Sequence, residues 1–418
     1  MSGQRIAIIG SGIAGLTTAH LLQRQHDVTV FEANDYIGGH THTVPVESNG
    51  RTVEVDTGFI VCNDRNYPSF LRFMDNLGVQ LQPTEMSFSV RNDADALEYN
   101  GHNLNTLFCQ RRNLLRPSFI RFVRDILTFN KLAKQALEED RVGDQTLDDF
   151  ISNAGLGPML RDNYLLPMVA AIWSCSVRQA GGFPLRFFLQ FFLNHGLLDV
   201  RNRPQWYVLK GGSHAYIEPM TRGFRDRIHL STPVQAVRRH ETGIEVSTAA
   251  GSTNFDQVVM ACHSDQALSL LADATSLETQ ILGDIGYQDN DVILHRDASI
   301  MPSRSLAWAS WNFLAGEGNE ASAPVVTYSM NILQGLPRDD TFLVTLNAAD
   351  KIDPDKIIQR FNYAHPVYST ASQRAQQRRE EICGQDRIHY CGAYWYNGFH
   401  EDGVRSALDV CQRFGESL

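Results

Sequence analysis

The sequence predicts an α/β protein with a Rossmann-like dinucleotide-binding domain and a second, discontinuous α+β domain. Three observations indicate this fold. The chain begins with an apolar strand, a glycine-rich turn and a helix, which is the order of a nucleotide-binding βαβ unit. Further strand, glycine and helix patterns occur far along the chain, near residues 208 and 388. At 418 residues the chain also exceeds the length at which one hydrophobic core usually stops growing, which predicts two lobes.

The first forty residues carry a nucleotide-binding signature. Residues 5–9 (RIAII) form a short run that is apolar after Arg5, and Gly10, Gly12 and Gly15 then match GxGxxG ahead of a helical apolar pattern. We expect Gly10 to make the tight turn, Gly12 to let the backbone approach a pyrophosphate, and Gly15 to let the helix pack on the strand. A second strand ends at Glu32, about 20 residues after the first glycine, where an acid is expected on the ribose hydroxyls.

Composition excludes several classes of protein. The chain has 37 basic and 47 acidic residues, a net charge of −10, which argues against a nucleic-acid binder. No window offers eighteen uninterrupted apolar residues, and the N-terminus has no basic, signal-like region, which predicts a cytoplasmic protein that spans no membrane. The cysteines are odd in number and lack a CxxC pair, so neither a disulfide framework nor a metal site is expected. They are Cys62, Cys109, Cys175, Cys262, Cys383, Cys391 and Cys411.

A second glycine pair follows closely after Glu32. Gly38 and Gly39 precede His40 and Thr41, where an NAD domain would normally run on into its next βαβ unit. This arrangement resembles the flavin-dependent amine oxidoreductase superfamily, which includes monoamine oxidases, phytoene desaturases and protoporphyrinogen oxidases. The resemblance implies FAD as the cofactor and an FAD-binding domain of the GR2 or amine oxidase type. That superfamily usually has GGR here, so His40 stands where the arginine is expected, and this departure weakens the transfer of the arginine's role to it.

Other segments extend the resemblance along the chain. Residues 55–58 are similar to a short Asp-x-Gly segment, residues 210–213 to a GG-helix-strand unit, and residues 388–404 to a C-terminal flavin motif, although Ala393 stands where an acid is common. The resemblance implies one set of cofactor-binding residues. They are Gly10, Gly12, Ile13, Ala14, Gly15, Glu32, Ala33, Gly38, Gly39, His40, Thr41, Val234, Gly392, Gly403 and Val404.

The spread of these motifs predicts discontinuous domains. The FAD-binding domain is expected to take residues 1–70, 205–285 and 385–418. The substrate domain is then 71–204, which reads as mostly helical, and 286–384, which holds strand-like runs. Because ligands of open α/β sheets bind beyond the carboxyl ends of the strands, we expect the flavin and the substrate at the seam between the lobes.

A narrower resemblance concerns the substrate. Residues 171–174, 308–312 and 398–403 look like a bacterial subgroup of predicted FAD proteins associated with cyclopropane-type fatty-acyl methyltransferases. It implies an acyl substrate and a lipid methyltransferase as partner. The amine-oxidase branch usually holds a water near the flavin with a lysine, but no lysine lies between Gly211 and Asp350, and Phe399 stands where a tyrosine is expected.

We therefore expect an FAD-dependent oxidoreductase that removes a hydride from an apolar substrate and desaturates an unsaturated or methyl-branched fatty-acyl chain. The alternatives are a fatty-acid double-bond isomerase, an amine oxidase acting on a small amine, and a non-catalytic flavoprotein that assists a lipid-modifying enzyme. His40, His400 and Tyr396 are the candidate catalytic residues, since imidazole titrates near neutral pH. His40 could instead bind a phosphate and His400 could cap a helix.

Two stretches of the substrate domain leave alternatives open. Between Asn105 and Gln135 there are seven basic residues and one acid among apolar ones, which fits either a solvated basic face or a peripheral contact of residues 111–134 with the inner face of the membrane. Residues 183–193 are so rich in phenylalanine that they predict either core packing or the wall of an apolar tunnel.

Overall fold

A five-stranded parallel sheet forms the centre of the first lobe. The computed structural model describes residues 3–173, 176–201, 203–315 and 324–418, so Ser174 and Cys175 lie outside the described residues. All neighbouring strands of this sheet run parallel. Their order is β10 (Ile228–His229), β2 (Asp27–Phe31), β1 (Arg5–Ile9), β14 (Gln257–Met260) and β20 (Ile388–Tyr390). The strands come from the two ends and the middle of the chain, so the predicted α/β fold with a Rossmann-like domain is confirmed.

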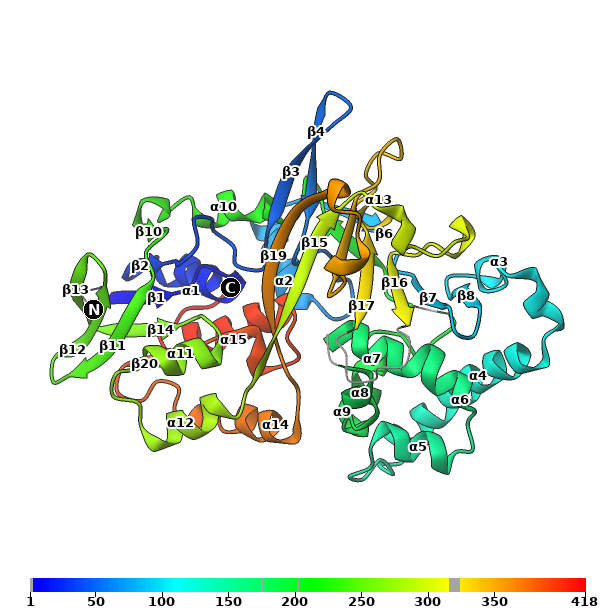
Figure 1. Cartoon of the computed structure of the whole chain (residues 1–418). Helices are drawn as coiled ribbons and strands as arrows, with labels where there is room; N and C mark the ends of the chain where they lie inside the picture. The colour runs from blue at the N-terminus through cyan, green and yellow to red at the C-terminus, as the bar shows by residue number, and fades with distance from the viewer. Residues whose placement is uncertain (1–2, 174–175, 202, 316–323) are drawn as a thin grey trace.

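Helix α1 (Ile13–Leu22) packs against the C-terminal helix α15 (His400–Gln412) beside this sheet (Figure 1). Both helices begin at the carboxyl ends of strands, α1 after β1 and α15 shortly after β20. Smaller elements complete the lobe. They are α2 (Pro68–Asn76), α10 (Ile217–Thr221), α11 (Ser264–Leu270), α12 (Ser276–Gly283), α14 (Thr370–Gln377), and the antiparallel β11 (Val234–His240), β12 (Gly243–Thr248) and β13 (Gly251–Phe255). The hairpin of β3 (Thr43–Ser48) and β4 (Arg51–Asp56) packs its buried valines against residues of the second lobe such as Val292 and Val344.

A seven-stranded mixed sheet forms the second lobe. Its order is β19 (Ile357–Pro366), β15 (Tyr287–His295), β18 (Leu343–Leu346), β17 (Val325–Ser329), β16 (Trp311–Ala315), β7 (Phe88–Asn92) and β8 (Leu97–Asn100). Only β16 and β7 pair in parallel, and this pair joins two segments that are more than 200 residues apart. A three-stranded sheet of β5 (Cys62–Asn63), β9 (Trp206–Leu209) and β6 (Leu81–Thr84) lies in the region of the predicted boundary at residue 205.

Helices cover one end of this lobe, at the right of Figure 1. They are α3 (Leu104–Leu107), α4 (Pro117–Glu138), α5 (Leu147–Asn153), α6 (Pro158–Leu160), α7 (Leu166–Trp173), α8 (Val177–Gly181) and α9 (Leu185–Asn194). Residues 81–100 differ from the prediction of a mostly helical segment because β6, β7 and β8 occur there. These strands are four or five residues long, and β6 and β7 are stabilised by their distant partners β9 and β16, while β8 pairs with β7. No described helix is long and apolar enough to cross a membrane.

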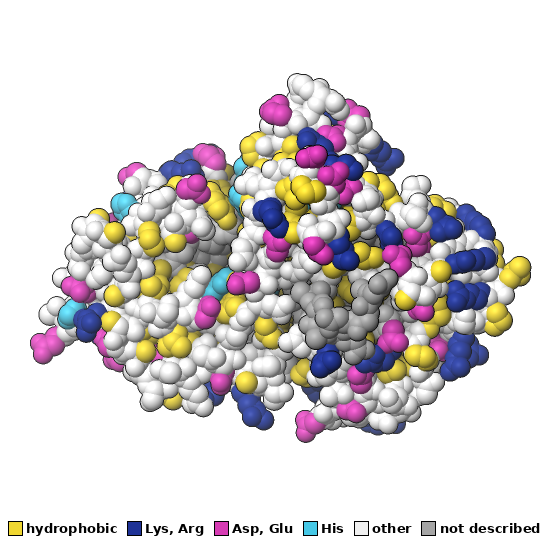
Figure 2. Space-filling model, in the orientation of Figure 1, with side chains coloured by type: hydrophobic (Ala, Val, Ile, Leu, Met, Phe, Trp, Pro, Cys, Tyr) yellow, Lys and Arg dark blue, Asp and Glu magenta, His cyan; other side chains and the backbone are white. Residues whose placement is uncertain are grey.

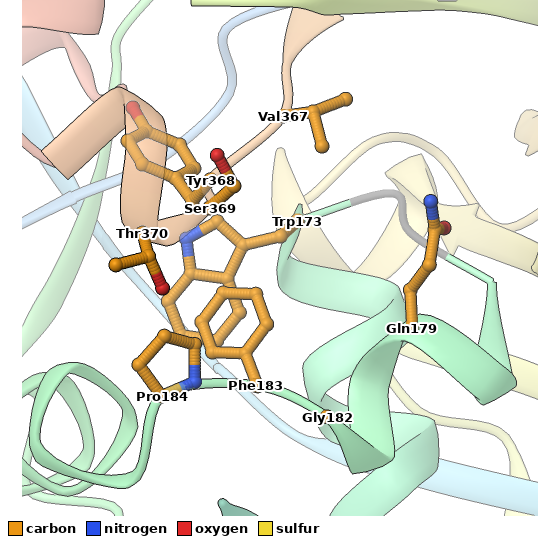
Figure 3. Close-up of a pocket in the computed structure, with 9 residues that line it drawn as sticks. All are labelled: Trp173, Gln179, Gly182, Phe183, Pro184, Val367, Tyr368, Ser369 and Thr370. Atoms are coloured by element: carbon orange, nitrogen blue, oxygen red, sulfur yellow. The ribbon is translucent and has the colours of Figure 1, made fainter. Parts of the chain in front are cut away.

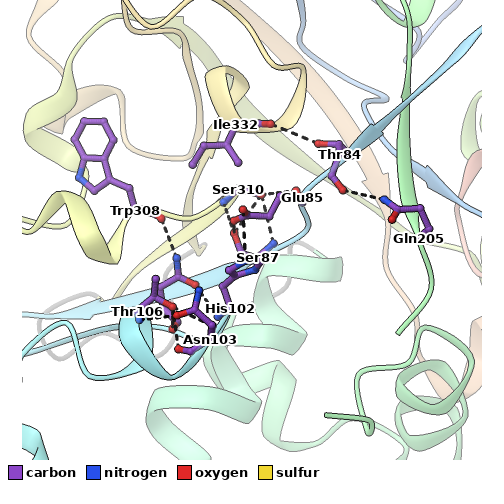
Figure 4. Close-up of polar contacts among 11 residues, drawn as sticks. Thr84, Glu85, Ser87, His102, Asn103, Thr106, Gln205, Trp308, Ser310 and Ile332 are labelled. Atoms are coloured by element: carbon purple, nitrogen blue, oxygen red, sulfur yellow. Dashed lines mark hydrogen bonds and ion pairs between the residues drawn. The ribbon is translucent and has the colours of Figure 1, made fainter. Parts of the chain in front are cut away.

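Polar side chains join the start of β7 to the start of β16 (Figure 4). The amide of Ser310 donates to Ser87 Oγ at 3.0 Å, and Ser310 Oγ donates to the carbonyl of Glu85 at 2.6 Å. Asn100 Nδ2 donates to the carbonyl of Trp308 at 2.8 Å. Residues 308–312, which carried part of the narrower resemblance, therefore have a structural role in fixing the register of the sheet.

Candidate functional site

The glycine-rich turn between β1 and α1 is shaped by contacts that only glycine permits. Gly10 has φ of +105°, in the left-handed region. A Cβ on Gly15 would lie 2.0 Å from the carbonyl oxygen of Gly10, so this glycine is required for the close packing of helix on strand. A Cβ on Gly12 would meet no described atom within 4 Å. The N-terminus of α1, with buried Ile13 and Ala14, therefore opens onto free space at Gly12, as an anion-binding helix start requires.

Glu32 lies buried beyond the carboxyl end of β2. Its Oε2 accepts hydrogen bonds from the amide and the hydroxyl of Ser11, at 2.9 and 2.6 Å, and its Oε1 accepts from the amide of Asn34 at 2.9 Å. Its carbonyl accepts from the amide of Thr232, two residues before Val234. The structure thus brings the predicted ribose acid, the glycine turn and the segment of Val234 together, with Ala33 exposed beside them.

Gly38 and Gly39 pack directly on the glycine-rich turn between β1 and α1. Gly38 forms a bridge with Gly12, and a Cβ on Gly39 would lie 3.2 Å from Gly12 Cα. Two residues on, Thr41 Oγ1 lies 2.5 Å from the hydroxyl of Tyr216 and 2.8 Å from His400 Nε2. The 38–41 loop is therefore held from one side by the turn and from the other by α15.

The Asp-x-Gly segment at residues 55–58 fixes this loop. A Cβ on Gly58 would lie 2.1 Å from the carbonyl oxygen of His40, so only glycine fits there. Asp56 accepts hydrogen bonds from the amide and hydroxyl of Ser213 and from the hydroxyl of Thr43, between 2.6 and 2.9 Å. Burial raises the pKa of Asp56 to about 6, and these donors oppose the rise. The carboxyl group joins the hairpin to the middle glycine motif.

The C-terminal segment completes the cradle. A Cβ on Gly403 would lie 2.6 Å from Ile13 Cγ2, so the first turn of α15 packs against the first turn of α1. Gly392, at the end of β20, donates its amide to Ser406 Oγ at 2.9 Å, and Val404 is fully buried. The first turns of two helices thus meet, and both place positive ends of helix dipoles at one site.

His40 lies at the centre of a group of aromatic side chains from distant parts of the chain. Its ring centroid is 5.8 Å from that of His263, 5.3 Å from Tyr363 and 5.6 Å from His365. Its Nε2 is buried and has no hydrogen-bond partner among the described residues. Burial lowers the pKa of His40, and a backbone hydrogen bond with Ala364 opposes this, so the ring is neutral near pH 7.

His263 and His365 were missed by the sequence reasoning. Burial, together with the neighbouring imidazoles, lowers the pKa of each to about 3. His263 follows the strand β14 closely, at the edge of the sheet where ligands bind, and that position is the signal that could have indicated it. His365 lies in β19 of the other lobe, and no local pattern connects it to the glycine motifs.

The other two candidate catalytic residues have partners that favour structural roles. His400 is buried, and its ring stacks on Phe59. The Tyr396 hydroxyl donates to Asp409 Oδ2 at 2.7 Å, and the guanidinium carbon of Arg405 lies 4.0 Å from its ring centre. Their catalytic roles remain predictions.

A cavity of about 270 Å³ lies between the helices of the second lobe and the start of α14 (Figure 3). The side chains that line it, within the described part of the chain, are neutral and largely aromatic or apolar. They belong to Trp173, Gln179, Gly182, Phe183, Pro184, Val367, Tyr368, Ser369 and Thr370. Trp173 Nε1 and the Tyr368 hydroxyl are buried without a hydrogen-bond partner among the described residues, so a bound molecule could satisfy them.

An aromatic wall joins this cavity to the C-terminal motif. The ring of Trp173 lies 4.7 Å from Phe183 and 4.7 Å from Phe191, and Phe191 stacks on Phe399 at 5.4 Å. Phe399 is the residue that precedes α15. Helix α9 therefore has two roles, because Phe188 and Phe192 on its other side are fully buried in the core.

Comparison with known proteins identifies the class to which this fold and site belong. Residues 13–293, well over half of the chain, match the family described as flavin containing amine oxidoreductase. The chain belongs to this family. Its members are FAD-dependent oxidoreductases, and FAD is the cofactor.

Individual relatives are distant. The chain is 26% identical to L-amino-acid oxidase of Siganus canaliculatus over 98% of this chain and 85% of that protein. Over 61% of this chain, it is also 26% identical to AofH of Mycobacterium tuberculosis, a protein whose name describes it as a flavin-containing monoamine oxidase. The match spans 56% of the length of AofH.

Solved structures show the same fold. The CLA-producing fatty acid isomerase from P. acnes has a TM-score of 0.71 at 16% identity, with 99% of both chains covered. Cyclohexylamine oxidase from Brevibacterium oxydans has a TM-score of 0.67 at 15% identity, also over 99% of both chains. At this level of identity the likeness concerns the fold alone.

The site itself fits FAD. The open face of Gly12 and the two helix N-termini suit a pyrophosphate, the carboxylate of Glu32 suits ribose hydroxyls, and the unpartnered Nε2 of His40 can meet a polar atom of the cofactor. This agreement rests on the unpartnered Nε2 of His40 and on the open face of Gly12, which the contacts within the described structure leave unexplained.

Proposed function

We propose that the chain is an FAD-dependent oxidoreductase that removes a hydride from an unsaturated or methyl-branched fatty-acyl chain and desaturates it. The observation that carries this proposal is the aromatic wall from Trp173 through Phe191 to Phe399, which connects the cavity to the C-terminal flavin motif. A wall of stacked rings binds a long apolar chain by burial of its surface and offers it few polar partners.

The geometry supports a division of roles among the residues. The glycine turn, Glu32, the 38–41 loop and the first turn of α15 would hold FAD, with the remaining residues of the predicted cofactor set beside them. Bound FAD would supply an acceptor for one hydride, which carries two electrons and one proton. The aromatic wall would orient the acyl chain and exclude water from it. The ring of His40 is neutral and its Nε2 has no hydrogen-bond partner among the described residues, so this atom would accept a proton.

Isomerisation of a double bond is the second candidate. The same wall would hold the same kind of substrate, and a hydride returned to a neighbouring carbon would leave the reaction redox-neutral. The fatty acid isomerase from P. acnes shares the fold, which makes this candidate structurally reasonable. Amine oxidation is supported by the names of AofH and the L-amino-acid oxidase, but the described lining of the cavity contains no carboxylate for an ammonium group.

An anaerobic titration tests the proposal. The purified yellow protein is titrated with bacterial phospholipid, and the flavin absorbance and the lipids are both followed. Desaturation predicts bleaching of the band near ~450 nm with lipids two hydrogens lighter. An oxidised band with a shifted double bond would establish isomerisation. If neither lipid nor flavin changes while a small amine bleaches the band, the acyl proposal is wrong.

Two variants, one that fills the cavity and one outside it, make this test more specific. Gly182 lines the cavity and has an ordinary backbone conformation, and a Cβ there would meet only the carbonyl of Gln179 at 3.7 Å. Gly182→Leu should therefore fold, bind FAD and raise KM for the acyl substrate. The matched control is Gly283→Leu, at the exposed end of α12, where a Cβ would meet only Leu268 at 3.8 Å. Equal kinetics in both variants would place the substrate elsewhere.

A further inference from the structure

A basic and apolar face lies at the end of the second lobe that is remote from the parallel sheet. In Figure 2 dark-blue basic side chains gather at the right-hand end of the molecule with yellow apolar side chains among them, where Figure 1 shows α3 and α4. We call this surface the α3–α4 face. It comprises Leu104, Arg111, Arg112, Leu114, Leu115, Arg116, Ile120, Arg121, Arg124, Leu127 and Lys131.

Large apolar side chains on this face are unusually exposed. Leu115 is 90% exposed and Leu104 is 74% exposed, and Leu114, Ile120 and Leu127 are each about half exposed. They come from three consecutive elements, α3, the short 3-10 helix at Arg111–Leu115, and α4. A cluster of exposed leucine and isoleucine side chains on a water-exposed surface marks an interaction site, whereas a single exposed apolar side chain needs no explanation.

Helix α4 has a buried face and an exposed face. Phe119, Phe122 and Phe129 point into the core of the lobe and are fully buried. Ile120, Arg124, Leu127 and Lys131 follow one another at spacings of three or four, so they share the outward face. Packing within the chain therefore accounts for the inward phenylalanines and leaves the outward residues without a partner in the described structure.

The positive charge of the face is only slightly neutralised. Its one acid, Asp125, is turned inward, where it accepts from the amide of Gly157 and lies 3.5 Å from Arg121. Arg116, Arg124 and Lys131 form no ion pair with any described residue. The protein as a whole carries a net charge of −10, so this concentration of positive charge runs against the average surface.

The face also has a shallow depression. It measures about 320 Å³ and lies between the 3-10 helix and α4, lined by Leu114, Leu115, Pro117, Ile120, Arg121 and Arg124. A lining that combines apolar side chains with two guanidinium groups matches a group that is apolar at one end and anionic at the other. That combination is the chemistry of an anionic phospholipid.

We propose that the α3–α4 face docks the protein on an anionic phospholipid bilayer. The exposed leucines and Ile120 enter the boundary between headgroups and acyl chains, and the basic side chains contact the lipid phosphates. A second copy of this chain is a poor occupant, because a two-fold contact would bring two positive faces together. The inference goes beyond the proposed reaction, because it follows from exposure and charge at a surface outside the FAD cradle and the aromatic cavity.

Vesicle co-sedimentation of the FAD-loaded protein tests this proposal. At low salt, the wild type should bind vesicles that contain phosphatidylglycerol and should not bind pure phosphatidylcholine vesicles. Added salt should weaken the binding, since screening shortens the range of surface charges. The charge variant Arg116→Gln, Arg124→Gln, Lys131→Gln should bind about 100-fold more weakly, because each basic residue near an anionic surface contributes about fivefold.

A matched control removes the same charge elsewhere. Arg222, Arg225 and Arg238 are exposed on the first lobe, and their replacement by glutamine should leave binding as in the wild type. The apolar variant Leu104→Ser, Leu115→Ser should also lose binding, although its charge is unchanged. All variants should keep the flavin spectrum and turnover on detergent-dispersed substrate.

Three results would overturn the docking proposal. The first is a wild type that ignores anionic vesicles, the second is equal loss in the charge variant and its control, and the third is concentration-dependent dimerisation that the charge variant abolishes. None of them depends on which reaction the flavin site performs, so failure of the docking proposal and failure of the acyl proposal are distinguishable.

Discussion

The imidazole of His400 lies flat on the phenyl ring of Phe59, with ring centroids 3.6 Å apart and an angle of 13° between the planes. Its Nε2 is 2.8 Å from Thr41 Oγ1. Burial lowers the pKa of His400 well below its usual range, so the ring is neutral near pH 7. The geometry favours a structural role in which His400 connects α15 to the 38–41 loop.

Replacement of His400 by phenylalanine tests that role. The phenyl ring keeps the stack on Phe59 but loses the hydrogen bond to Thr41, so the free energy of unfolding should fall by about 1–3 kcal/mol. The shape of the pH profile of kcat/KM should not change. Chemical denaturation and steady-state kinetics measure the two quantities. Loss of one limb of the profile would instead assign His400 to proton transfer.

The two glycines of the first turn should fail in different ways. In Gly12→Ala the new methyl group points into free space, so the protein should fold normally but bind FAD more weakly, because the methyl occupies the approach to the pyrophosphate. In Gly15→Ala the methyl group would lie 2.0 Å from the Gly10 carbonyl, so the fold itself should be destabilised, by several kcal/mol on the order expected for overpacking.

Thermal unfolding and flavin content, measured on both glycine variants, separate the two effects. A low Tm with full flavin content in Gly12→Ala would contradict the assignment of that position to the cofactor. Normal stability in Gly15→Ala would show that the helix can move away from the strand at little cost.

Asp402 gives the protein a predictable loss of stability as the pH rises from about 4 to about 7. Burial, followed by the neighbouring charge of Glu401, raises its pKa to about 7, although the amide of Phe399 donates to it at 2.9 Å. Because the folded state holds this proton more tightly than the unfolded chain, its contribution is fully present below about pH 4 and is lost as the pH rises towards 7.

The neutral variant Asp402→Asn keeps an acceptor for the Phe399 amide and removes the charge. It should therefore match the wild type near pH ~4 and exceed it increasingly up to pH ~7, by on the order of a few kcal/mol. Denaturant unfolding at several pH values measures the difference. Asp265→Asn, at the exposed start of α11, is the control and should show no such divergence. A constant difference at all pH values would indicate that Asp402 is ionised throughout.

His40→Gln tests the proposed proton acceptor. A neutral amide cannot take the proton, so kcat should fall by about 10²-fold or more and the acid limb of the pH profile should disappear. The limb has this sign because His40 acts as a base only when it is unprotonated. His263→Gln, in the same aromatic group, should retain the limb. If His40→Gln loses FAD but keeps its normal kcat when saturated with FAD, His40 positions the cofactor instead.

The sequence by itself determined the nucleotide-binding unit. Gly10, Gly12, Gly15 and Glu32 have local geometric requirements that leave a recognisable spacing, because a tight turn, a close backbone approach and a strand end are properties of a few consecutive residues. For the same reason the family resemblance at residues 38–58 and 388–404 was visible without a structure.

Only the tertiary structure decided the surroundings of that unit. His40, His263 and His365 meet because a loop, the end of β14 and the far edge strand β19 converge, and no sequence spacing encodes that convergence. The parallel pairing of β7 with β16 and the wall from Trp173 to Phe399 likewise join distant segments. Burial keeps His400 neutral and raises the pKa of Asp402. The sequence does not show either effect, because desolvation depends on what packs around a group rather than on its neighbours in sequence.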